Sequence, residues 1–269
     1  MRPDVGGALA ALGRKTLDAG TLAREVGAHA RAMLFWTFVA PWKGRGRIRW
    51  VSVFEQGVRI GWDAVPIVVV ITFFVGVITA LQTASLLRQF GQPIFTANAV
   101  ALSMSRELGP LLTGIIVAGR SGSAFTAEIG SMKMAEEVDA LQTMGLNPAH
   151  FLMVPRLLAM AAAVPLLTLL AVFAGIFGGW LIGVTVVDLG SLQYLRQTAS
   201  AIDMGDVMRG LTKSFIFGIL IAEVGCFLGS HVEGGAEGVG RSTTASVVAS
   251  IFLIIVANLV FTAFFYIVE

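Results

Sequence analysis

Residues 106–156 decide the fold, and they read RELGPLLTGIIVAGRSGSAFTAEIGSMKMAEEVDALQTMGLNPAHFLMVPR. The stretch opens on the charged pair Arg106 and Glu107, continues as an apolar run to Ala118, and becomes polar again from Gly119. Long apolar segments lie on both sides of it. Simple membrane anchors carry no such charged block. The stretch therefore predicts a membrane protein with functional charged and polar residues within its spans and next to them.

The composition of the whole chain indicates a membrane protein. Hydrophobic residues make up 56% and charged residues 13% of the 269 positions, and the mean hydropathy is +0.81. A soluble chain of this length needs about a quarter of its residues charged to cover its surface. Lipid must therefore form part of the solvent. The single cysteine, Cys226, excludes an internal disulfide.

Five apolar segments each reach the ~20 residues that a membrane-spanning helix needs. They cover approximately residues 64–87, 98–118, 157–187, 210–229 and 246–268. Lys and Arg number 19, and more than half of them precede Trp62, which predicts a cytoplasmic amino terminus. An odd number of spans then places the carboxyl terminus in the periplasm. We divide the chain into a cytoplasmic or interfacial region (1–61) and a transmembrane domain (62–269).

The amino-terminal region does not resemble a cleavable signal peptide, because charged residues interrupt positions 1–32. Residues 33–40 (MLFWTFVA) are apolar but too short to cross about 30 Å of hydrocarbon. Pro41 and a basic run over 43–49 follow them. A short apolar segment flanked by cations favours a helix lying in the headgroup region of one leaflet. A cytosolic helix packed on a partner is the alternative.

Ionisable residues inside the predicted spans are the first candidates for function. Arg106 and Glu107 lie in the second span and Glu223 lies in the fourth. Because a charge in hydrocarbon is costly, each should face a partner or a wet cavity. Arg106 and Glu107 are about 100° apart on a helix and should point in different directions, and Pro110 should bend the helix after them. Two interpretations stay open: a polar cavity within the membrane, and an ion pair such as Arg106 with Glu223.

Residues 131–144 predict a short amphipathic helix between the second and third spans. Its apolar residues share one face at spacings of four and three: Met134, Val138 and Leu141. Its charged residues occupy the rest of the circumference: Lys133, Glu136, Glu137 and Asp139. Gly145 should cap the helix, and the residues over 119–123 should form a tight turn after the second span. Such a helix suits a groove in a soluble partner. The alternative, a helix lying on the membrane, is disfavoured by its acidic face.

Glycines recur every four residues in the third span, at Gly175, Gly179 and Gly183. Such a ridge lets helix backbones approach closely in lipid. Packing within one bundle is the simpler interpretation and a contact between subunits is the sharper one. The sequence does not separate them.

The sequence lacks the motifs of nucleotide binding, metal binding and hydrolysis. It contains no G-x-x-x-x-G-K-[ST] phosphate loop, no H-E-x-x-H, no Cys/His cluster and no G-x-S-x-G elbow. We therefore expect no catalysis and no metal or cofactor bound by this chain, and nothing indicates nucleic-acid binding.

The 106–156 run resembles the signature of the MlaE/YrbE permeases, the membrane subunits of ABC transporters associated with MCE proteins. The runs GGAEGVGRSTTASVV (234–248) and PLLTLLAVFAGIFGGWLIG (165–183) are also similar to that family. The resemblance covers roughly residues 50–269. Asn258 departs from it, because many relatives carry an acidic residue at this position.

The resemblance implies a homodimeric permease of the bacterial inner membrane, with an interfacial elbow helix and five spans per subunit. It implies that the 131–144 helix couples to a cytoplasmic ABC ATPase dimer, which binds the ATP and Mg²⁺, and it adds Glu128 to the coupling residues. An MCE ring at the outer ends of the spans and a small STAS-type protein are the other implied partners. The dimer cavity would hold a phospholipid, with Arg106, Glu107 and Pro110 beside it, while Glu223 stays open between the two interpretations.

The predicted function is therefore ATP-driven movement of phospholipid, or of a related amphiphile, between the inner membrane and an MCE assembly. One rival is a stand-alone secondary transporter or channel, for which Arg106, Glu107, Lys213 and Glu223 could supply an ion pathway. A second rival is an anchor for an MCE ring that transports nothing itself.

Overall fold

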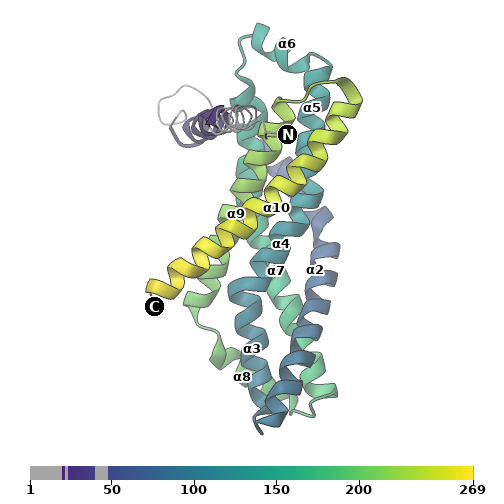
Figure 1. Cartoon of the computed structure of the whole chain (residues 1–269), viewed down its shortest axis with the longest axis vertical. Coiled ribbons are helices and arrows are strands. Elements are labelled where there is room, and N and C mark those ends of the chain that lie inside the picture. The colour runs from purple at the N-terminus through teal and green to yellow at the C-terminus, as the bar shows by residue number, and fades with distance from the viewer. Residues whose placement is uncertain (1–19, 22–23, 40–47, 269) are drawn as a thin grey trace, which may run out of the picture.

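A computed structural model describes residues 20–21, 24–39 and 48–268 of the chain, and within these residues all regular structure is helical (Figure 1). Five helical segments are long and apolar enough to cross a membrane, which confirms the all-α fold with five spans. They are Trp50–Gln89, Pro93–Met134, Ala149–Thr185, Met204–Ser230 and Gly235–Ile267.

The first span is the single helix α2 (Trp50–Gln89), which runs through the predicted boundary between residues 61 and 62 without a break. The third span consists of η5 (Ala149–Met153) and α7 (Val154–Thr185), and α2 packs along α7 for much of its length. The short helix α8 (Ser191–Ala201) follows at the far end of the bundle, beside α3 (Figure 1).

The second span is a composite helix that is interrupted twice by wider π-helical turns. Its parts are η2 (Pro93–Phe95), α3 (Thr96–Ser103), η3 (Met104–Leu108), α4 (Gly109–Val117), η4 (Ala118–Gly122) and α5 (Ser123–Met134). The tight turn predicted over 119–123 was wrong, because η4 continues the helix. Its glycine allows close packing: a Cβ at Gly122 would lie 2.7 Å from a methyl of Ile221, so contact with α9 overrides the local turn preference.

The single helix predicted over 131–144 was also wrong, because the structure has two. The first, α5, ends at Met134, Glu136 adopts a left-handed conformation (φ 60°, ψ 11°), and α6 (Glu137–Thr143) begins after it. The backbone N–H groups of residues 135 and 136 close the end of α5 on the Ser131 and Lys133 carbonyls. The end at Gly145 (φ 76°) is as predicted.

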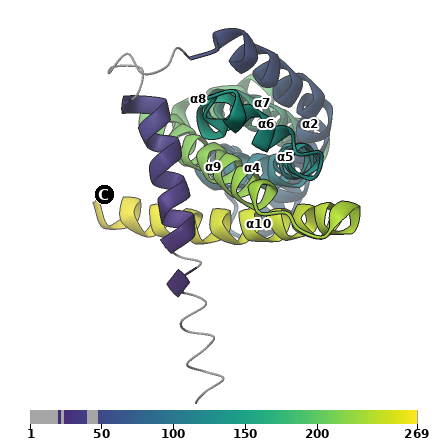
Figure 2. The same ribbon diagram turned by 90° about the horizontal axis from the view of Figure 1, so that it is seen from above.

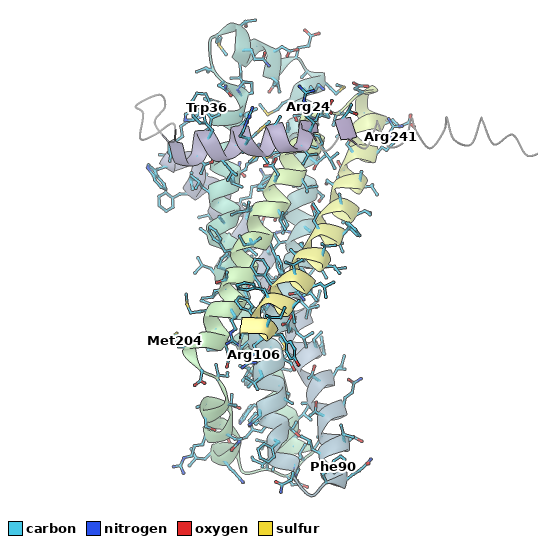
Figure 3. The ribbon with its side chains drawn as sticks, turned by 60° about the vertical axis from the view of Figure 1, so that its left-hand side comes forward. Arg24, Trp36, Phe90, Arg106, Met204 and Arg241 are labelled. Carbon is cyan, nitrogen blue, oxygen red and sulfur yellow. The ribbon has the colours of Figure 1, made fainter. Side chains whose placement is uncertain are left out.

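The last two spans are α9 (Met204–Ser230) and α10 (Gly235–Val268). α10 crosses the bundle diagonally, and its carboxyl end stops short of the end where α3 and α8 lie (Figures 1 and 3). Of the most apolar 18-residue stretch of α10, only 11% is buried, whereas 56% of the corresponding stretch of α9 is buried. One face of α10 is therefore left without a protein neighbour in the described chain.

Residues 24–39, which end in η1 (Phe35–Val39), form a helix that lies across the bundle axis (Figures 2 and 3). Met33 is 1% exposed, and the Trp36 ring lies 5.2 Å from that of His150. The crosswise direction is that expected of a helix lying in a membrane interface. Ala40, Pro41 and the basic residues over 43–47 lie outside the described residues.

The glycine ridge of the third span faces other helices of the same chain. A Cβ at Gly175 would lie 2.1 Å from the Met104 side chain, and one at Gly183 would lie 2.4 Å from the Tyr194 ring. A Cβ at Gly179 would meet Val100 at 2.7 Å. The ridge thus serves packing within one bundle, the simpler of the two interpretations.

Tyr194 supplies a prediction for the effect of pH. It lies on α8, outside the five spans, and its buried hydroxyl has no hydrogen-bond partner among the described residues. Burial raises the pKa of Tyr194 from 10.0 to about 12. The unfolded state therefore ionises first, so this stabilising contribution is complete below pH 10 and is lost as the pH rises to about 12.

We expect the unfolding free energy of the wild type to fall across that interval relative to Tyr194→Phe, which has no group to titrate there. Thermal unfolding of both purified proteins across the interval measures the difference. Curves that stay parallel from neutral pH upward would contradict the expectation.

Candidate functional site

A partly buried ionic cluster lies where η3, α9 and α10 meet. Lys213 is 1% exposed, and its Nζ donates hydrogen bonds to Glu107 Oε1 at 2.6 Å and to Thr262 Oγ1 at 2.9 Å. Asn258 Nδ2 donates to the other carboxylate oxygen, Glu107 Oε2, at 3.1 Å. The Glu107 carboxylate therefore accepts hydrogen bonds from side chains of both α9 and α10. Asn258 acts here as a donor, a role that an ionised acidic residue at this position could not fill.

Arg106 belongs to the same region but has a different partner. Its Nε donates to Asp206 Oδ1 at 2.6 Å, and Asp206, 3% exposed, also accepts the Asp203 backbone N–H at 3.0 Å in the capping box of α9. The charge-assisted contact ties η3 to the first turn of α9. The suggested ion pair between Arg106 and Glu223 was wrong, because Arg106 binds Asp206 and Glu223 binds His29.

Arg106 and Glu107 line one cavity of about 120 Å³, although they were expected to point apart. The wider π-helical turn of η3 changes the direction of consecutive side chains. The cavity is rich in cations and is closed on one side by the end of α10. Its lining residues are Arg106, Glu107, Arg209, Lys213, Thr262, Phe265 and Tyr266.

Pro110 explains the presence of η3. The Gly109 N–H bonds to the Met104 carbonyl, and Pro110 has no N–H to offer, so the Ser105 carbonyl lacks its usual helical donors. That carbonyl lies against Gly210 of α9, where a Cβ would come within 2.2 Å of the oxygen. Pro110 itself is buried beside Gly210 rather than lining the ionic cavity.

An apolar cavity of about 220 Å³ opens on the other side of the contact between Ser105 and Gly210. Its walls come from α7, α9, η3 and the connection between α8 and α9. They consist of Ser105, Thr168, Leu169, Val172, Phe173, Ile176, Ile202, Val207, Gly210 and Leu211. A charged cavity and an apolar cavity thus flank one helix contact inside the bundle.

Glu223 lies away from the ionic cavity and binds the crosswise helix. His29 Nδ1 lies 2.7 Å from Glu223 Oε1, and both side chains are 13% exposed. The His29 ring also packs edge-on against Phe227, with 5.5 Å between the ring centroids. The ion-pair interpretation therefore describes Glu223 better than the cavity interpretation, with a partner that the sequence did not suggest.

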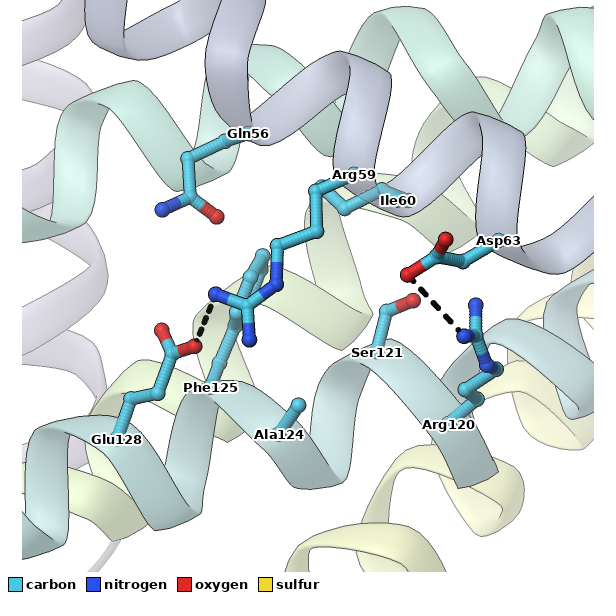
Figure 4. A pocket seen from close by; sticks show the side chains of 9 residues that line it. All are labelled: Gln56, Arg59, Ile60, Asp63, Arg120, Ser121, Ala124, Phe125 and Glu128. Atoms are coloured by element: carbon cyan, nitrogen blue, oxygen red, sulfur yellow. Dashed lines mark hydrogen bonds and ion pairs between the residues drawn. The ribbon is translucent and has the colours of Figure 1, made fainter.

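Glu128 connects three helices near the other end of the bundle. Its Oε1 accepts from Arg59 Nη1 of α2 at 2.5 Å, and its Oε2 accepts from Arg156 Nη2 of α7 at 3.0 Å. A second ion pair joins Arg120 to Asp63 at 3.2 Å. The predicted coupling residue Glu128 therefore braces α5 against α2 and α7, and Figure 4 shows its contact with Arg59 of α2.

α6 stands at the extreme end of the bundle, beyond α5 (Figure 1). The acidic side chains of Glu136, Glu137 and Asp139 are exposed. Leu141 is 9% exposed and Met134 is 39% exposed, while Val138 and Lys133 are half-buried. The predicted apolar face is therefore only partly covered, and the acidic face is open to a partner.

Sequence reasoning missed Asp206, Thr262 and His29, and it used Lys213 only in a rival hypothesis. Asp203 and Asp206 stand three residues apart before an apolar run, a spacing that signals a capping box. Thr262 and His29 carry no comparable signal, because their partners lie on other helices far along the chain.

Five spans, an ionic cavity within them and an exposed acidic helix at one end describe a multi-pass membrane protein. Comparison with known proteins gives its class, that of the membrane permeases. The model of the family described as Permease MlaE matches residues 53–264, and this chain belongs to the MlaE permease family.

Three relatives illustrate how far the similarity extends. A probable ABC transporter permease protein of Rickettsia prowazekii (strain Madrid E) is 39% identical over 214 residues, which cover 80% of this chain and 83% of the relative. A probable ABC transporter permease protein of Synechocystis sp. is 37% identical, with coverage of 80% and 81%. The chloroplastic protein TRIGALACTOSYLDIACYLGLYCEROL 1 of Arabidopsis thaliana is 34% identical, with coverage of 82% and 63%. The chain is thus a membrane permease of the ABC transporter type, a class that works with an ATPase.

Proposed function

We propose that this permease moves a phospholipid, or a related amphiphile, through the membrane. The observation that carries the proposal is the pairing of a cation-rich cavity with an apolar cavity across a single contact between η3 and α9. A phospholipid has an anionic phosphodiester at one end and hydrocarbon at the other, and the two cavities offer a matching environment to each. The name of the Arabidopsis relative contains that of a diacylglycerol glycolipid, which supports a two-chain membrane lipid as the substrate but not a charged headgroup.

A second copy of the chain would complete the lipid site. α10 exposes large apolar side chains along one face, among them Val248, Phe252, Ile255 and Leu259. A shallow groove on this face contains the small residues Thr244, Ala245 and Ala249, which allow close approach of another helix in lipid. The ionic cavity lies at the carboxyl end of this helix, so a homodimer through α10 would enclose it.

The remaining partners follow from the two ends of the bundle. An ABC ATPase dimer, which supplies the ATP and Mg²⁺ chemistry, would receive α6 on the cytoplasmic side of the bacterial inner membrane. A small STAS-type protein would accompany it, and an MCE ring would cover the periplasmic end near α8. Motion of α6 would be transmitted through α5 to α2 and α7, because Glu128 of α5 binds an arginine of each of these two helices.

Charge reversal on α6 tests the coupling step. We expect Glu136→Lys combined with Glu137→Lys to lower ATP-driven lipid transport at least tenfold in a complex reconstituted with its ATPase, because these exposed acidic side chains meet the partner. Transport of a fluorescent phospholipid and ATP turnover are measured in the same vesicles.

The matched control is Glu233→Lys combined with Glu237→Lys, which makes the same charge change on exposed residues beside the start of α10. It should transport normally. Undiminished transport by the α6 variant would refute coupling at this helix. ATP-independent transport by the wild type would favour a secondary transporter or channel, and absence of lipid-stimulated ATP turnover would favour a passive anchor.

A further inference from the structure

A polar cleft opens between α2 and α5, well away from the ionic cavity near the end of α10. Arg59 and Asp63 enter it from α2, and Arg120 and Glu128 enter it from η4 and α5 (Figure 4). Its volume is about 110 Å³, and Gln56, Ile60, Ser121, Ala124 and Phe125 complete the lining. The cleft shares no lining residue with the two transport cavities, although its Arg59–Glu128 pair belongs to the proposed coupling path from α6 to α2.

The cleft holds arginine donors that its own carboxylates do not consume. Arg59 gives one nitrogen, Nη1, to Glu128, and Arg120 gives one, Nη2, to Asp63. A guanidinium carries five N–H donors. The side chains of Arg59 and Arg120 are 63% and 43% exposed, so the other donors remain accessible. Two arginines and two carboxylates line the cleft, and the buried Arg156 behind it, which also pairs with Glu128, brings the connected cluster to a net charge of +1.

The depth of the cleft matches that of phospholipid phosphates. Asp63 directly precedes the apolar run of the first span, and Arg120 directly follows that of the second. The headgroup layer adds roughly 5–8 Å on each side of the hydrocarbon, and Arg59 lies about 7 Å along the helix from the start of the run. Trp62, 78% exposed, marks the same level, where aromatic residues collect in membrane proteins.

A protein partner fits the cleft less well than a lipid. Glu128 lies about 13 Å along the helical path from the start of α6, and α6 stands beyond the end of α5 (Figure 1). A soluble protein bound to α6 would therefore be held away from the cleft by the part of α5 that separates the two. A headgroup in the adjoining leaflet already lies at the level of Arg59 and Arg120.

We propose that the cleft between α2 and α5 binds the phosphodiester of a membrane phospholipid, held by the free donors of Arg59 and Arg120. Guanidinium groups bind phosphate oxygens in charge-assisted pairs, often two bonds at a time. Asp63 competes with the phosphate for Arg120. This site is separate from the transport cavity and does not depend on the proposed transport function.

The ion pair between Asp63 and Arg120 provides a test with two opposite outcomes. Arg120→Gln removes a phosphate ligand, and we expect it to weaken binding of dioctanoyl phosphatidylglycerol about tenfold. Asp63→Asn removes the competitor and should strengthen binding severalfold. Native mass spectrometry of the full chain in detergent, titrated with this lipid, measures both. Arg59→Gln should weaken binding like Arg120→Gln, and Arg196→Gln, at an exposed position of α8, is the matched control and should leave binding unchanged.

Both variants of the pair break the same contact, so any loss of folding is common to them and only lipid affinity separates them. Shifts in the same direction, or no shift in either, would overturn the proposal. Equal binding of dioctanoylglycerol, which lacks the phosphate, would also overturn it. Displacement of the lipid by inorganic phosphate alone would assign the cleft to a free anion instead.

Discussion

Glu107→Ala is expected to lower the unfolding free energy by about 2–3 kcal/mol, because it leaves the buried Lys213 ammonium without its countercharge; the 36% exposure of Glu107 keeps the cost below the ~3–5 kcal/mol of a fully buried pair. The cost arises from Lys213, which is 1% exposed and sits between α9 and α10. Its remaining contact is the hydroxyl of Thr262, which carries no charge. Unfolding of the purified protein in mixed micelles of mild detergent and dodecyl sulfate measures the change.

The double variant Glu107→Ala with Lys213→Met separates charge from packing. Methionine keeps most of the lysine volume and brings no charge, so we expect the double variant to recover most of the lost stability. Lipid bound per purified chain should change in both variants, because Glu107→Ala frees the Lys213 ammonium for an anionic headgroup and Lys213→Met removes that cation from the cavity. A double variant as unstable as the single one would show that the cost has another origin, and normal lipid content in both would refute the cavity assignment.

The second large effect is expected at Gly76, where α2 crosses α7. A Cβ built there would lie 1.9 Å from the Gly175 carbonyl oxygen, and a backbone oxygen cannot rotate away as a flexible side chain can. The two helices would have to separate along the most extensive contact in the bundle. We expect Gly76→Ala to destabilise the protein by about 3 kcal/mol, the upper part of the range for overpacked cores.

Gly61→Ala is the matched control, since it makes the same change in the same helix where nothing lies within 4 Å of the added Cβ. It should stabilise the protein by about 0.5–1 kcal/mol through helix propensity alone. Both variants are compared with the wild type by the same unfolding assay. Equal effects of the two substitutions would show that the contact between Gly76 and Gly175 does not limit helix packing.

Helix number and type were predictable because they depend on apolar length, which the sequence displays directly. The interior of the second span was not. η4 replaced a predicted turn because Gly119–Ser123 looks like loop sequence in isolation, while the packing of Gly122 on Ile221 appears only in three dimensions. The break at Glu136 was missed for a related reason. A left-handed glutamate has no sequence signal, and the amphipathic pattern continued across it.

The candidate site was predictable in its charged residues but not in their pairing. Arg106 and Glu107 are visible because charges inside apolar runs are rare. Their partners Asp206 and Lys213 lie on another helix, about a hundred positions away. Glu223 shows the same limit, since its partner His29 lies in the crosswise helix, 194 positions earlier. Spacing along one helix carries no information about such contacts.

The attachment of α10 has a thermodynamic consequence. Near its carboxyl end this poorly buried helix is fastened to the bundle by Asn258 and Thr262, and both bind the carboxylate of Glu107. A ligand that takes one of these hydrogen bonds from Glu107 loosens the last helix by the free energy of that bond. Linkage is reciprocal, so anything that shifts α10, including a second subunit seated on it, changes ligand affinity by the same factor. The tilt of α10 and the occupancy of the cavity are thus thermodynamically coupled, so a change in either one shifts the other.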